Sequence, residues 1–498
     1  MNATLLFCAV SVLLILLLWL TYCYAHKETD LPPLAVGALP ILGHIWLGAI
    51  KKERLYETAL ESILTSSFQK GEETVYLSGI LWKLYVCADP EDMQLLSNTC
   101  LKKDPLYEFF NSLAGGKDGL IGSDVSTWKI HRKLLNPTMN QSVLDTYLAQ
   151  FNEQSCHLVA LLSKEVGKGY FNPLVYLRET VLRVICETLM GVSVAGEETL
   201  IYEFAEALGV FSTCFIERMK KFYYCNETLF NWSSLKKKQD AAASIVHNLP
   251  AEIIRRKRAR MSQQEYNETD TSSRFKSFLD LLLEMDKAGT LTESEVQQEV
   301  NTFFAAAFDT TYHALGMMLL TIGSYPEVQQ KIVDQLQTVF EGSTRDVEKQ
   351  DMSKLKYLEA VVKETMRLYP VIMGVGRILD KDLKLKRYTL PAGSRCFMSI
   401  YHAGRHRSWG ADAAQFRPER WLDGSLPRST AAYAVFGLGK RSCIGSNFAI
   451  TLMKTVLCHI VRHYRISGDI TRVVLAADIV VTPMSGHHVT LEKRIAKI

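Results

Sequence analysis

Residues 436–445, FGLGKRSCIG, place a single cysteine, Cys443, among glycines and a basic pair. Three hypotheses account for a thiol in this setting: a buried structural cysteine, a nucleophile, or a metal ligand. A nucleophile needs a stabilised thiolate, which Arg441 and backbone N–H groups left open by the glycines could provide. The stretch does not choose among the three, because each hypothesis requires different partners elsewhere in the chain.

A long apolar segment upstream contains a second unusual stretch. Thr292 followed by Glu295 is a capping-box signature, and the next proline is Pro326, so the pattern predicts one helix of about 30 residues. Its middle is almost wholly apolar, which predicts burial on all sides. Asp309 and Thr310 interrupt it. They either face another helix or form a proton path, in which Asp309 passes protons and the Thr310 hydroxyl orients them at a reacting centre.

Three shorter motifs carry polar residues that are unremarkable by themselves. Glu364 and Arg367 lie three apart in KETMR and share a helical face, as an ordinary surface pair does. Trp128 and Arg132 lie four apart in STWKIHRKLL and project together, as in an amphipathic helix with a basic face. Arg420 belongs to the loop-like segment FRPERW. Whether these residues have a functional role depends on the other motifs in the chain.

The composition is that of an ordered globular protein, with 498 residues, 48% of them hydrophobic and 22% charged. A net charge of +4 gives no support to general nucleic-acid binding. The basic run RRKRAR, residues 255–260, is interpreted as an exposed helix end leading into a loop, in preference to a binding patch. The 11 cysteines include no C-x-x-C pair, which is typical of reduced thiols in a cytosol-facing protein.

The N-terminal sequence predicts a membrane anchor. Residues 5–25 are apolar, uncharged and long enough to span a bilayer. Lys27 follows the span, and this basic bias favours a body on the cytoplasmic side. We expect residues 1–25 to form an uncleaved transmembrane helix, residues 26–45 a proline-rich linker, and residues 46–498 a single domain.

This body is predicted to be mainly α with a minor β part. Helical periodicity dominates residues 128–340 and returns up to Leu368. Residues 72–90 alternate and are rich in β-branched and aromatic residues, as in a hairpin, and residues 380–391 also predict strands. The polar break at residues 262–274 is predicted to be a surface loop.

Taken in order, these pieces resemble the cytochrome P450 family of haem-thiolate monooxygenases over essentially the whole chain. A cysteine that binds metal alone is unusual for zinc, which takes four ligands, but natural for haem, which leaves an axial position for the protein. The family pattern F-x-x-G-x-R-x-C-x-G is matched at every fixed position by Phe436, Gly439, Arg441, Cys443 and Gly445. The resemblance implies the cytochrome P450 fold with an N-terminal transmembrane helix and one haem-binding monooxygenase domain.

The resemblance assigns the cofactor-binding residues. Cys443 would be the axial thiolate of haem iron, with Phe436 packed beside the sulfur. Glycines such as Gly437 would let backbone N–H groups point at that sulfur. The haem propionates would be bound by Arg441, Trp128, Arg132 and Arg377.

The resemblance also assigns residues on both sides of the haem. Glu364, Arg367 and Arg420 would form the structural network on the proximal side, and we expect haem incorporation to depend on it. On the distal side, Asp309 and Thr310 match the acid–alcohol pair that feeds protons to the reacting centre. These two residues would be the catalytic pair.

Two positions on the long helix depart from the family pattern. The family usually has glycine where this chain has Ala307, so a methyl group would narrow the oxygen-binding groove. Residues 299–311, EVNTFFAAAFDTT, also resemble the E-V-D-T-F-M-F-E-G-H-D-T-T of the family 4 fatty-acid ω-hydroxylases, insect members included. In many of those the glutamate forms an ester with a haem methyl, and here Ala306 replaces it. We therefore expect haem b without covalent attachment.

The implied reaction inserts one oxygen atom from O2 into a lipophilic substrate, such as a fatty acid, terpenoid, steroid or foreign compound. Electrons would come from NADPH through cytochrome P450 reductase, with cytochrome b5 as a further partner, at the cytoplasmic face of the endoplasmic reticulum membrane. Alternative hypotheses are a reductase-independent haem-thiolate isomerase or dehydratase and a haem-bearing ligand-binding protein. Substrate contacts are expected at Phe303, Ala305, Ala306, Val371, Val375 and Met484.

Overall fold

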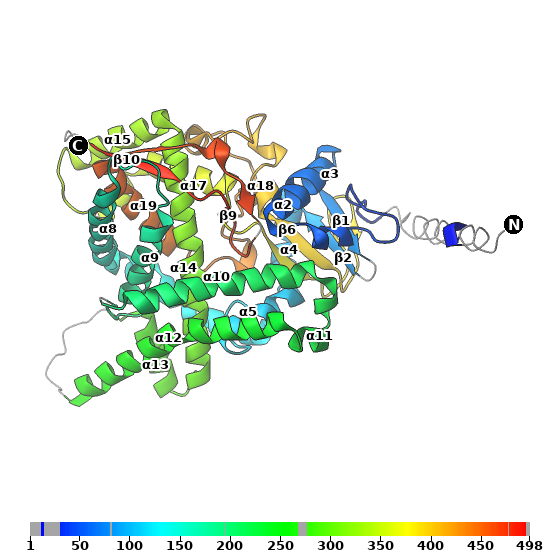
Figure 1. The fold of residues 1–498 in the computed structure, drawn as a ribbon, viewed down its shortest axis with the longest axis horizontal. Coiled ribbons are helices and arrows are strands. Elements are labelled where there is room, and N and C mark those ends of the chain that lie inside the picture. Colours follow the sequence, from blue (N-terminus) through cyan, green and yellow to red (C-terminus); the bar gives the residue numbers. More distant parts are fainter. Residues whose placement is uncertain are drawn as a thin grey trace.

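Helices form most of the chain, and a small sheet lies to one side of them (Figure 1). This is the mainly α arrangement with a minor β part that the sequence predicts. Of the predicted anchor, all but residues 11–13 lie outside the described part of the chain. The computed structural model describes residues 11–13, 30–79, 82–194, 196–266, 276–476 and 478–494.

The α-helices are spread along the whole chain and are joined by short 3-10 turns and one π-helical stretch, Glu57–Thr65. They are α2 (Lys52–Tyr56), α3 (Ser66–Gln69), α4 (Pro90–Thr99), α5 (Phe109–Ala114), α6 (Val125–Leu135), α7 (Gln141–Thr146), α8 (Leu148–Leu162), α9 (Leu174–Thr188), α10 (Glu198–Lys220), α11 (Glu227–Asn231), α12 (Ser234–Tyr266), α13 (Phe278–Lys287), α14 (Glu293–Ser324), α15 (Pro326–Phe340), α16 (Lys349–Met352), α17 (Lys356–Leu368), α18 (Ile400–Ala403) and α19 (Ser446–His463).

A four-stranded sheet in the order β1-β2-β6-β3 forms the main β part. β1 (Thr74–Gly79) and β2 (Trp82–Cys87) form the antiparallel hairpin that the sequence predicts. β2 pairs in parallel with β6 (Arg395–Ser399), which pairs antiparallel with β3 (Gly374–Ile378). The remaining sheets are two-stranded: β10 (Val489–Lys493) with β7 (Tyr464–Gly468), β4 (Leu383–Lys384) with β5 (Thr389–Leu390), and β8 (Leu475–Ala476) with β9 (Thr482–Pro483).

α14 runs through the middle of the molecule and is the long helix that the sequence predicts (Figure 1). Its capping box is present: the Glu295 N–H donates to the Thr292 hydroxyl at 3.2 Å, and the Thr292 N–H donates to the Glu295 carboxylate at 2.7 Å. Near the other end, a Cβ on Gly323 would meet the backbone nitrogen of Gly468 in β7 at 2.8 Å, so only glycine permits this approach. Neighbouring elements therefore cover most of α14, and only a minority of its residues are exposed or partly exposed.

Two predictions about α12 were wrong. The expected helix end at residues 255–260 lies inside the helix, and residues 262–266 of the expected loop continue it. Acidic partners on neighbouring elements explain this: Lys257 Nζ, for example, lies 2.8 Å from an Asp280 carboxylate oxygen of α13. Part of the basic run therefore ties α12 to its surroundings: Arg256, Lys257 and Arg258 pair with acidic residues of neighbouring segments.

In the described part of the chain, α10 is the one helix that is long and apolar enough to cross a membrane by length and composition. Its most apolar window is 44% buried within the protein. α10 lies alongside α12 over the front of the molecule (Figure 1). These contacts are those of a core helix and lend no support to a second membrane span.

Candidate functional site

The loop before α19 holds Cys443 in a backbone conformation that requires glycine. Gly437 and Gly439 have φ angles of +72° and +63°, in the left-handed region. A Cβ on Gly439 would also meet the Ser97 carbonyl oxygen of α4 at 2.9 Å. The Cys443 N–H donates to the Phe436 carbonyl at 2.7 Å and closes the loop. Local backbone geometry therefore sets the direction of the thiol.

The Cys443 thiol lies deep in the protein, yet its own surface is open. Burial raises the pKa of the thiol, although the Gly445 N–H and the charge of Arg132 act against this. A raised pKa disfavours an activated nucleophile, and an open surface disfavours a structural cysteine. A metal ligand fits both observations, because a metal replaces the thiol proton and a backbone N–H supports the bound thiolate.

Three of the residues predicted to bind propionates meet near this loop. The Arg441 guanidinium lies 4.2 Å over the Trp128 ring. Among the described residues, nothing accepts a hydrogen bond from the buried Nε and Nη1 of Arg441 or from the buried Nε of Arg377. Burial, together with the charges of Arg377 and Arg132, lowers the pKa of Arg441 to about 10. Buried unpaired donors are costly, so this cluster is suited to an anion.

Two further cations complete the cluster. Arg132 donates from Nη1 to the carbonyl of Ser442, in the cysteine loop, at 2.7 Å. Lys103 was missed by sequence analysis; an isolated β-bridge pairs it with Arg377. Burial, together with the charges of Arg377 and Arg441, lowers the pKa of Lys103 well below its usual value. Nothing in LKKDP distinguishes this lysine from a surface one.

These residues fit a haem group. A porphyrin presents two carboxylates to the protein, and guanidinium and ammonium groups bind carboxylates through charge-assisted hydrogen bonds. The unpaired donors of Arg441 and Arg377 decide the match, because carboxylate oxygens would satisfy them. Cys443 would supply the protein ligand that haem iron requires.

Glu364, Arg367 and Arg420, which were predicted to act together, form one network of fully buried side chains. The Glu364 carboxylate accepts from Arg367 Nη2 at 2.7 Å, from Arg420 Nε at 2.9 Å and from the Trp421 indole at 3.0 Å. Burial favours the neutral acid, but the hydrogen bonds outweigh it and hold the pKa of Glu364 below its usual value. Arg367 Nη1 also donates to the Ala413 carbonyl at 2.6 Å, so the network ties α17 to the segment that leads towards the cysteine loop.

α14 has a partly exposed face that carries the predicted acid–alcohol pair. Ala306, Ala307, Asp309 and Thr310 are partly exposed, whereas Phe308 between them is buried. The Thr310 hydroxyl donates to the Ala306 carbonyl one turn earlier at 2.8 Å, a bond typical of threonine in a helix. Because α14 also packs against α19, the helix that follows the cysteine loop, both parts of the site share one packed core.

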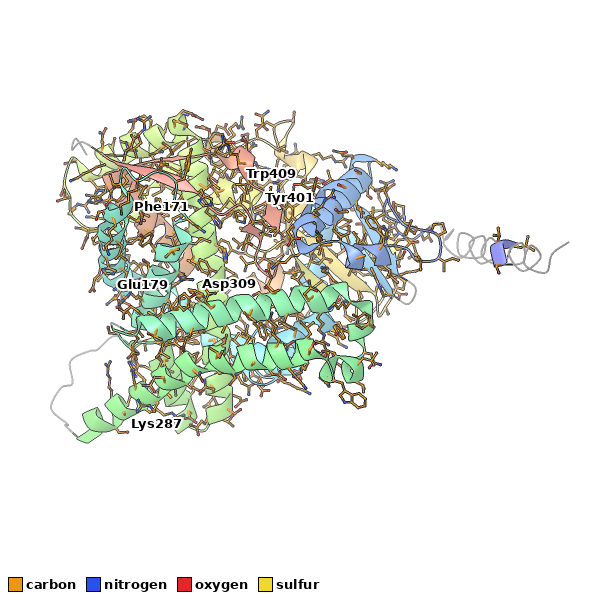
Figure 2. The ribbon with its side chains drawn as sticks, in the orientation of Figure 1. Phe171, Glu179, Lys287, Asp309, Tyr401 and Trp409 are labelled. Atoms are coloured by element: carbon orange, nitrogen blue, oxygen red, sulfur yellow. The ribbon has the colours of Figure 1, made fainter. Side chains whose placement is uncertain are left out.

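Asp309, labelled in Figure 2, has two neighbours on α14 that sequence analysis missed, Tyr312 and His313. His313 Nδ1 donates to the Asp309 carbonyl at 2.8 Å and lies 3.3 Å from its carboxylate. Burial and then the charge and hydrogen bond of the same carboxylate raise the pKa of the Tyr312 hydroxyl. The i, i+4 spacing of Asp309 and His313 is the signal that could have revealed the first contact.

A buried pair, Glu299 and His131, joins α14 to α6 and was also missed. His131 Nδ1 lies 2.7 Å from Glu299 Oε1, and the two side chains are 3% and 0% exposed. Burial raises the pKa of Glu299; burial lowers that of His131, but the Glu299 carboxylate outweighs this and raises it. α6 carries Trp128 and Arg132, so this pair fixes the helix that presents two predicted haem-binding side chains.

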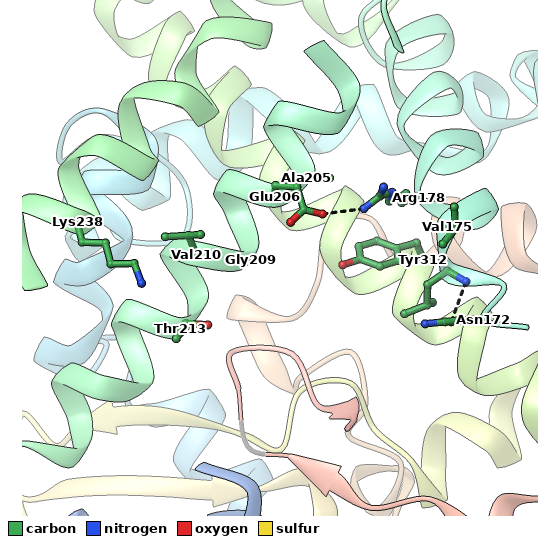
Figure 3. A pocket seen from close by; sticks show the side chains of 11 residues that line it. Asn172, Val175, Arg178, Ala205, Glu206, Gly209, Val210, Thr213, Lys238 and Tyr312 are labelled. Atoms are coloured by element: carbon green, nitrogen blue, oxygen red, sulfur yellow. Dashed lines mark hydrogen bonds and ion pairs between the residues drawn. The ribbon is translucent and has the colours of Figure 1, made fainter. Parts of the chain in front are cut away.

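A pocket of about 430 Å³ opens between α9, α10, α12 and α14 (Figure 3). Its wall includes an ion pair, with Arg178 Nη1 2.9 Å from Glu206 Oε1, together with Lys238 and the ring of Tyr312. The charged wall is unsuited to an apolar substrate, and none of the six predicted substrate residues belongs to it. The pocket does make Tyr312, which lies next to Asp309, accessible to solvent.

The six predicted substrate positions differ in exposure, and all six stay predictions. Phe303 and Ala305 are covered by protein, with the Phe303 ring centroid 4.2 Å from that of Phe278 in α13. Met484 is 48% exposed. The partly exposed positions are Ala306, Val371 and Val375.

A single cysteine beside a group of cations, two of which carry buried donors without a partner among the described residues, has the ligand chemistry of a haem-thiolate protein. The acid and alcohol on α14 match the proton donors that the sequence predicts for an oxygen-using member of this class.

Comparison with known proteins supports this assignment to the haem-thiolate class. The family model Cytochrome P450 matches residues 37–485. The chain is 31% identical over 447 residues to cytochrome P450 4c21 of Blattella germanica, an alignment that covers 87% of this chain and 86% of that protein. It is 30% identical over 418 residues to cytochrome P450 4V2 of Mus musculus, with 82% and 79% covered. It is 28% identical over 497 residues to cytochrome P450 4d2 of Drosophila melanogaster, with 96% and 97% covered.

The chain belongs to the cytochrome P450 family, and the relatives reported above carry family 4 names. It has the cytochrome P450 fold and is a cytochrome P450 monooxygenase with haem-thiolate iron.

Proposed function

We propose that this monooxygenase inserts one atom of O2 into a lipophilic substrate, which is a fatty acid, terpenoid, steroid or foreign compound. Electrons come from NADPH through cytochrome P450 reductase, and cytochrome b5 is a further partner. The observation that carries the proposal is the combination of the open Cys443 thiol with the partly exposed face of α14, on which Asp309 and Thr310 lie beside two alanines. This combination offers a metal ligand, proton donors and apolar surface in one core.

The chain's part in oxygen chemistry begins with holding the cofactor. Bound haem supplies the redox chemistry that activates O2. Cys443 would hold the haem iron through its thiolate, with Phe436 packed beside the sulfur and Gly437 shaping the loop. Arg441 and Arg377 hold propionates, and the support for this role is that their buried donors are unpaired within the described part of the chain. Trp128 and Arg132 complete the propionate site from α6.

Asp309 and Thr310 deliver protons, because the reduction of oxygen consumes them. The Asp309 carboxylate lies beside Tyr312 and His313, and the pocket that Tyr312 lines supports a supply of protons to Asp309 from solvent. The Thr310 hydroxyl is oriented by its bond to the Ala306 carbonyl at 2.8 Å and therefore presents its oxygen in one direction.

A lipophilic substrate is supported by the apolar character of the site. Ala306 and Ala307 present only methyl groups beside the acid–alcohol pair. Val371, Val375 and Met484 are the further predicted contacts, together with Phe303 and Ala305. An apolar compound that binds there removes its surface from water, which stabilises the complex by about 25 cal/mol per Å² of apolar surface buried.

Ala306 also bears on how the cofactor is held. An ester to a haem methyl requires a carboxylate on α14 next to Ala307, and alanine supplies none. The cofactor is therefore haem b, held by the iron–thiolate bond and the propionate contacts without a covalent bond to this helix.

The chain's organisation and location belong to the same proposal. Residues 1–25 anchor the protein as a single transmembrane helix, residues 26–45 form a proline-rich linker, and residues 46–498 form the haem-binding domain. This domain lies on the cytoplasmic face of the endoplasmic reticulum membrane. An anchored enzyme meets lipophilic substrates where they partition, which is consistent with the proposed substrate class.

The test is reconstitution of the full chain in phospholipid vesicles with cytochrome P450 reductase, NADPH and ¹⁸O2. We expect one ¹⁸O atom in the product of at least one lipophilic compound from a panel of fatty acids, terpenoids, steroids and foreign compounds. Cys443→Ala is the control that abolishes it. Conversion without reductase would indicate an isomerase or dehydratase, and ligand-induced haem spectra without product would indicate a binding protein; either result contradicts the proposal.

A further inference from the structure

Cys156, Asp346 and His459 bring a sulfur, an oxygen and a nitrogen together at the protein surface. They come from α8, from the segment before α16 and from α19, and their ligand atoms lie within 4.8 Å of one another. Cys156 Sγ is 3.7 Å from His459 Nδ1 and 4.0 Å from Asp346 Oδ1. None of these residues belongs to the haem site, and the monooxygenase reaction leaves them without a role.

The separations match those of a tetrahedral zinc site. Zinc lies about 2.3 Å from a thiolate sulfur and about 2.0 Å from an imidazole nitrogen or a carboxylate oxygen, so tetrahedral angles place the sulfur about 3.5 Å from the other two atoms. The observed distances of 3.7 and 4.0 Å are close to this value. Asp346 and Cys156 are exposed, so small rotations of their side chains complete the geometry.

A second residue fixes the histidine in the orientation of a ligand. Asn152 accepts from the Val347 N–H at 3.0 Å and donates to the Val347 carbonyl at 2.8 Å, which determines the orientation of its amide. The Asn152 oxygen lies 2.8 Å from His459 Nε2, so Nε2 carries the proton and donates. The lone pair of Nδ1 therefore faces Cys156 Sγ. Zinc-binding histidines are held in the same way, by an acceptor on their second nitrogen.

The charges around the three ligand atoms suit a divalent cation. Arg462 is already engaged, since its Nη1 donates to the Arg345 carbonyl at 2.9 Å. The Cys156 thiolate and the Asp346 carboxylate together balance the two charges of a zinc ion.

We propose that Cys156, Asp346 and His459 bind one Zn²⁺ ion, with water as the fourth ligand. The ion joins segments that lie 190 and 303 residues apart in the chain, and it stabilises the folded protein because the unfolded chain does not hold the three ligands together. At 1.5 Å per residue, His459 lies about 20 Å along α19 from its start near the cysteine loop, so the ion takes no part in oxygen chemistry. This inference does not depend on the proposed substrate or electron donor.

The test uses the haem-loaded full chain with Zn²⁺ alone as the probe. After exposure to zinc and removal of the excess, we expect about one zinc per haem, and X-ray absorption at the zinc edge should show one sulfur at about 2.3 Å. Cys156→Ser should weaken zinc binding by more than about 100-fold. Loss of a residue that only hydrogen-bonds a metal ligand costs about 10- to 100-fold, so a larger loss identifies Cys156 as a ligand. Asp346→Asn should weaken it as well. His157→Gln changes the next, exposed residue of α8 and should leave zinc binding unchanged.

Two results would overturn the inference. One is equal zinc content in Cys156→Ser and the unaltered protein. The other is an absorption spectrum with nitrogen and oxygen ligands but no sulfur, which identifies an adventitious ion only. Cys156 and Asp346 are exposed, so their variants are expected to fold; equal haem content and equal thermal midpoints without zinc verify this. The midpoint should rise with zinc concentration in the unaltered protein and in His157→Gln, but not in Cys156→Ser.

Discussion

Replacing Glu364 by alanine removes the carboxylate that two fully buried arginines share, Arg367 and Arg420. Both keep main-chain acceptors, such as the Ala413 carbonyl at 2.6 Å from Arg367 Nη1 and the Trp409 carbonyl at 3.2 Å from Arg420 Nη1. Arg420 also keeps the Asp412 carboxylate, which lies 3.3 Å from its Nη2 and is 27% exposed, whereas the described residues offer Arg367 no second carboxylate. Removing one partner of a buried ion pair costs about 3–5 kcal/mol, because a charge stays buried without compensation.

This magnitude predicts a measurable loss of stability. Unfolding entropy is about 2.1 cal/mol/K per residue, so over about 450 ordered residues a loss of 3–5 kcal/mol lowers the thermal midpoint by about 3–5 °C. The network also ties α17 to the segment before the cysteine loop, so we expect the haem content of purified Glu364→Ala to fall well below that of the unaltered protein. Glu364→Gln, which keeps an acceptor oxygen for the arginine donors but loses the negative charge, should fall between the two.

The assay combines haem content per chain with thermal unfolding followed by circular dichroism. The matched control is Glu327→Ala, an exposed glutamate in the first turn of α15, which should stay within about 0.5 kcal/mol of the unaltered protein. Normal haem content and an unchanged midpoint in Glu364→Ala would refute the reasoning. Such a result would mean that main-chain carbonyls alone satisfy both arginines.

Three further predictions concern Glu364, Arg441 and Ala306. The pKa of Glu364 is lower in the folded protein than in the unfolded chain, where it is about 4.5. The ionised carboxylate therefore stabilises the fold fully above about pH 4.5, and this stabilisation is lost as pH falls through the folded-state pKa. The thermal midpoints of the unaltered protein and Glu364→Gln should therefore converge in acid. Arg441→Ala should speed haem transfer to an acceptor protein about 10- to 100-fold, in keeping with one charge-assisted hydrogen bond. The haem-free protein should change little in stability, because relief of the buried, unpaired Nε and Nη1 offsets the lost contacts with the Trp128 ring and the Ser123 carbonyl. Acidic organic solvent should extract all the haem, whereas Ala306→Glu, which restores the carboxylate, should retain a protein-bound fraction on a denaturing gel.

Much of the local structure could be predicted from the sequence. The capping box Thr292–Glu295 and the absence of proline before Pro326 predicted α14, because these signals act within one turn of the chain. Glu364 and Arg367 lie three residues apart on one helix, so their contact follows from the helical repeat. The alternating pattern at residues 72–90 likewise predicted the hairpin of β1 and β2.

The rest could not be predicted because its partners are distant in the chain. The end of α12 was placed too early, since the acidic residues that pair with its basic run lie on other elements. Lys103 looks like a surface lysine in its own segment, and only the bridge to Arg377 brings it to the cation cluster. Glu299 and His131 are 168 residues apart and meet because α6 packs against α14.

By itself, the sequence determined the class of this protein: the order of its motifs identified a haem-thiolate monooxygenase. It also predicted Cys443 as the iron ligand and Asp309 with Thr310 as the proton-delivering pair. Only the tertiary structure decided which donors are buried without partners and which titratable groups share a surface. The spacing of the cysteines showed no zinc pattern, yet folding brings Cys156, Asp346 and His459 within 4.8 Å. The physical reason is that helix and strand signals are local, whereas burial, charge pairing and metal coordination depend on segments that folding brings together.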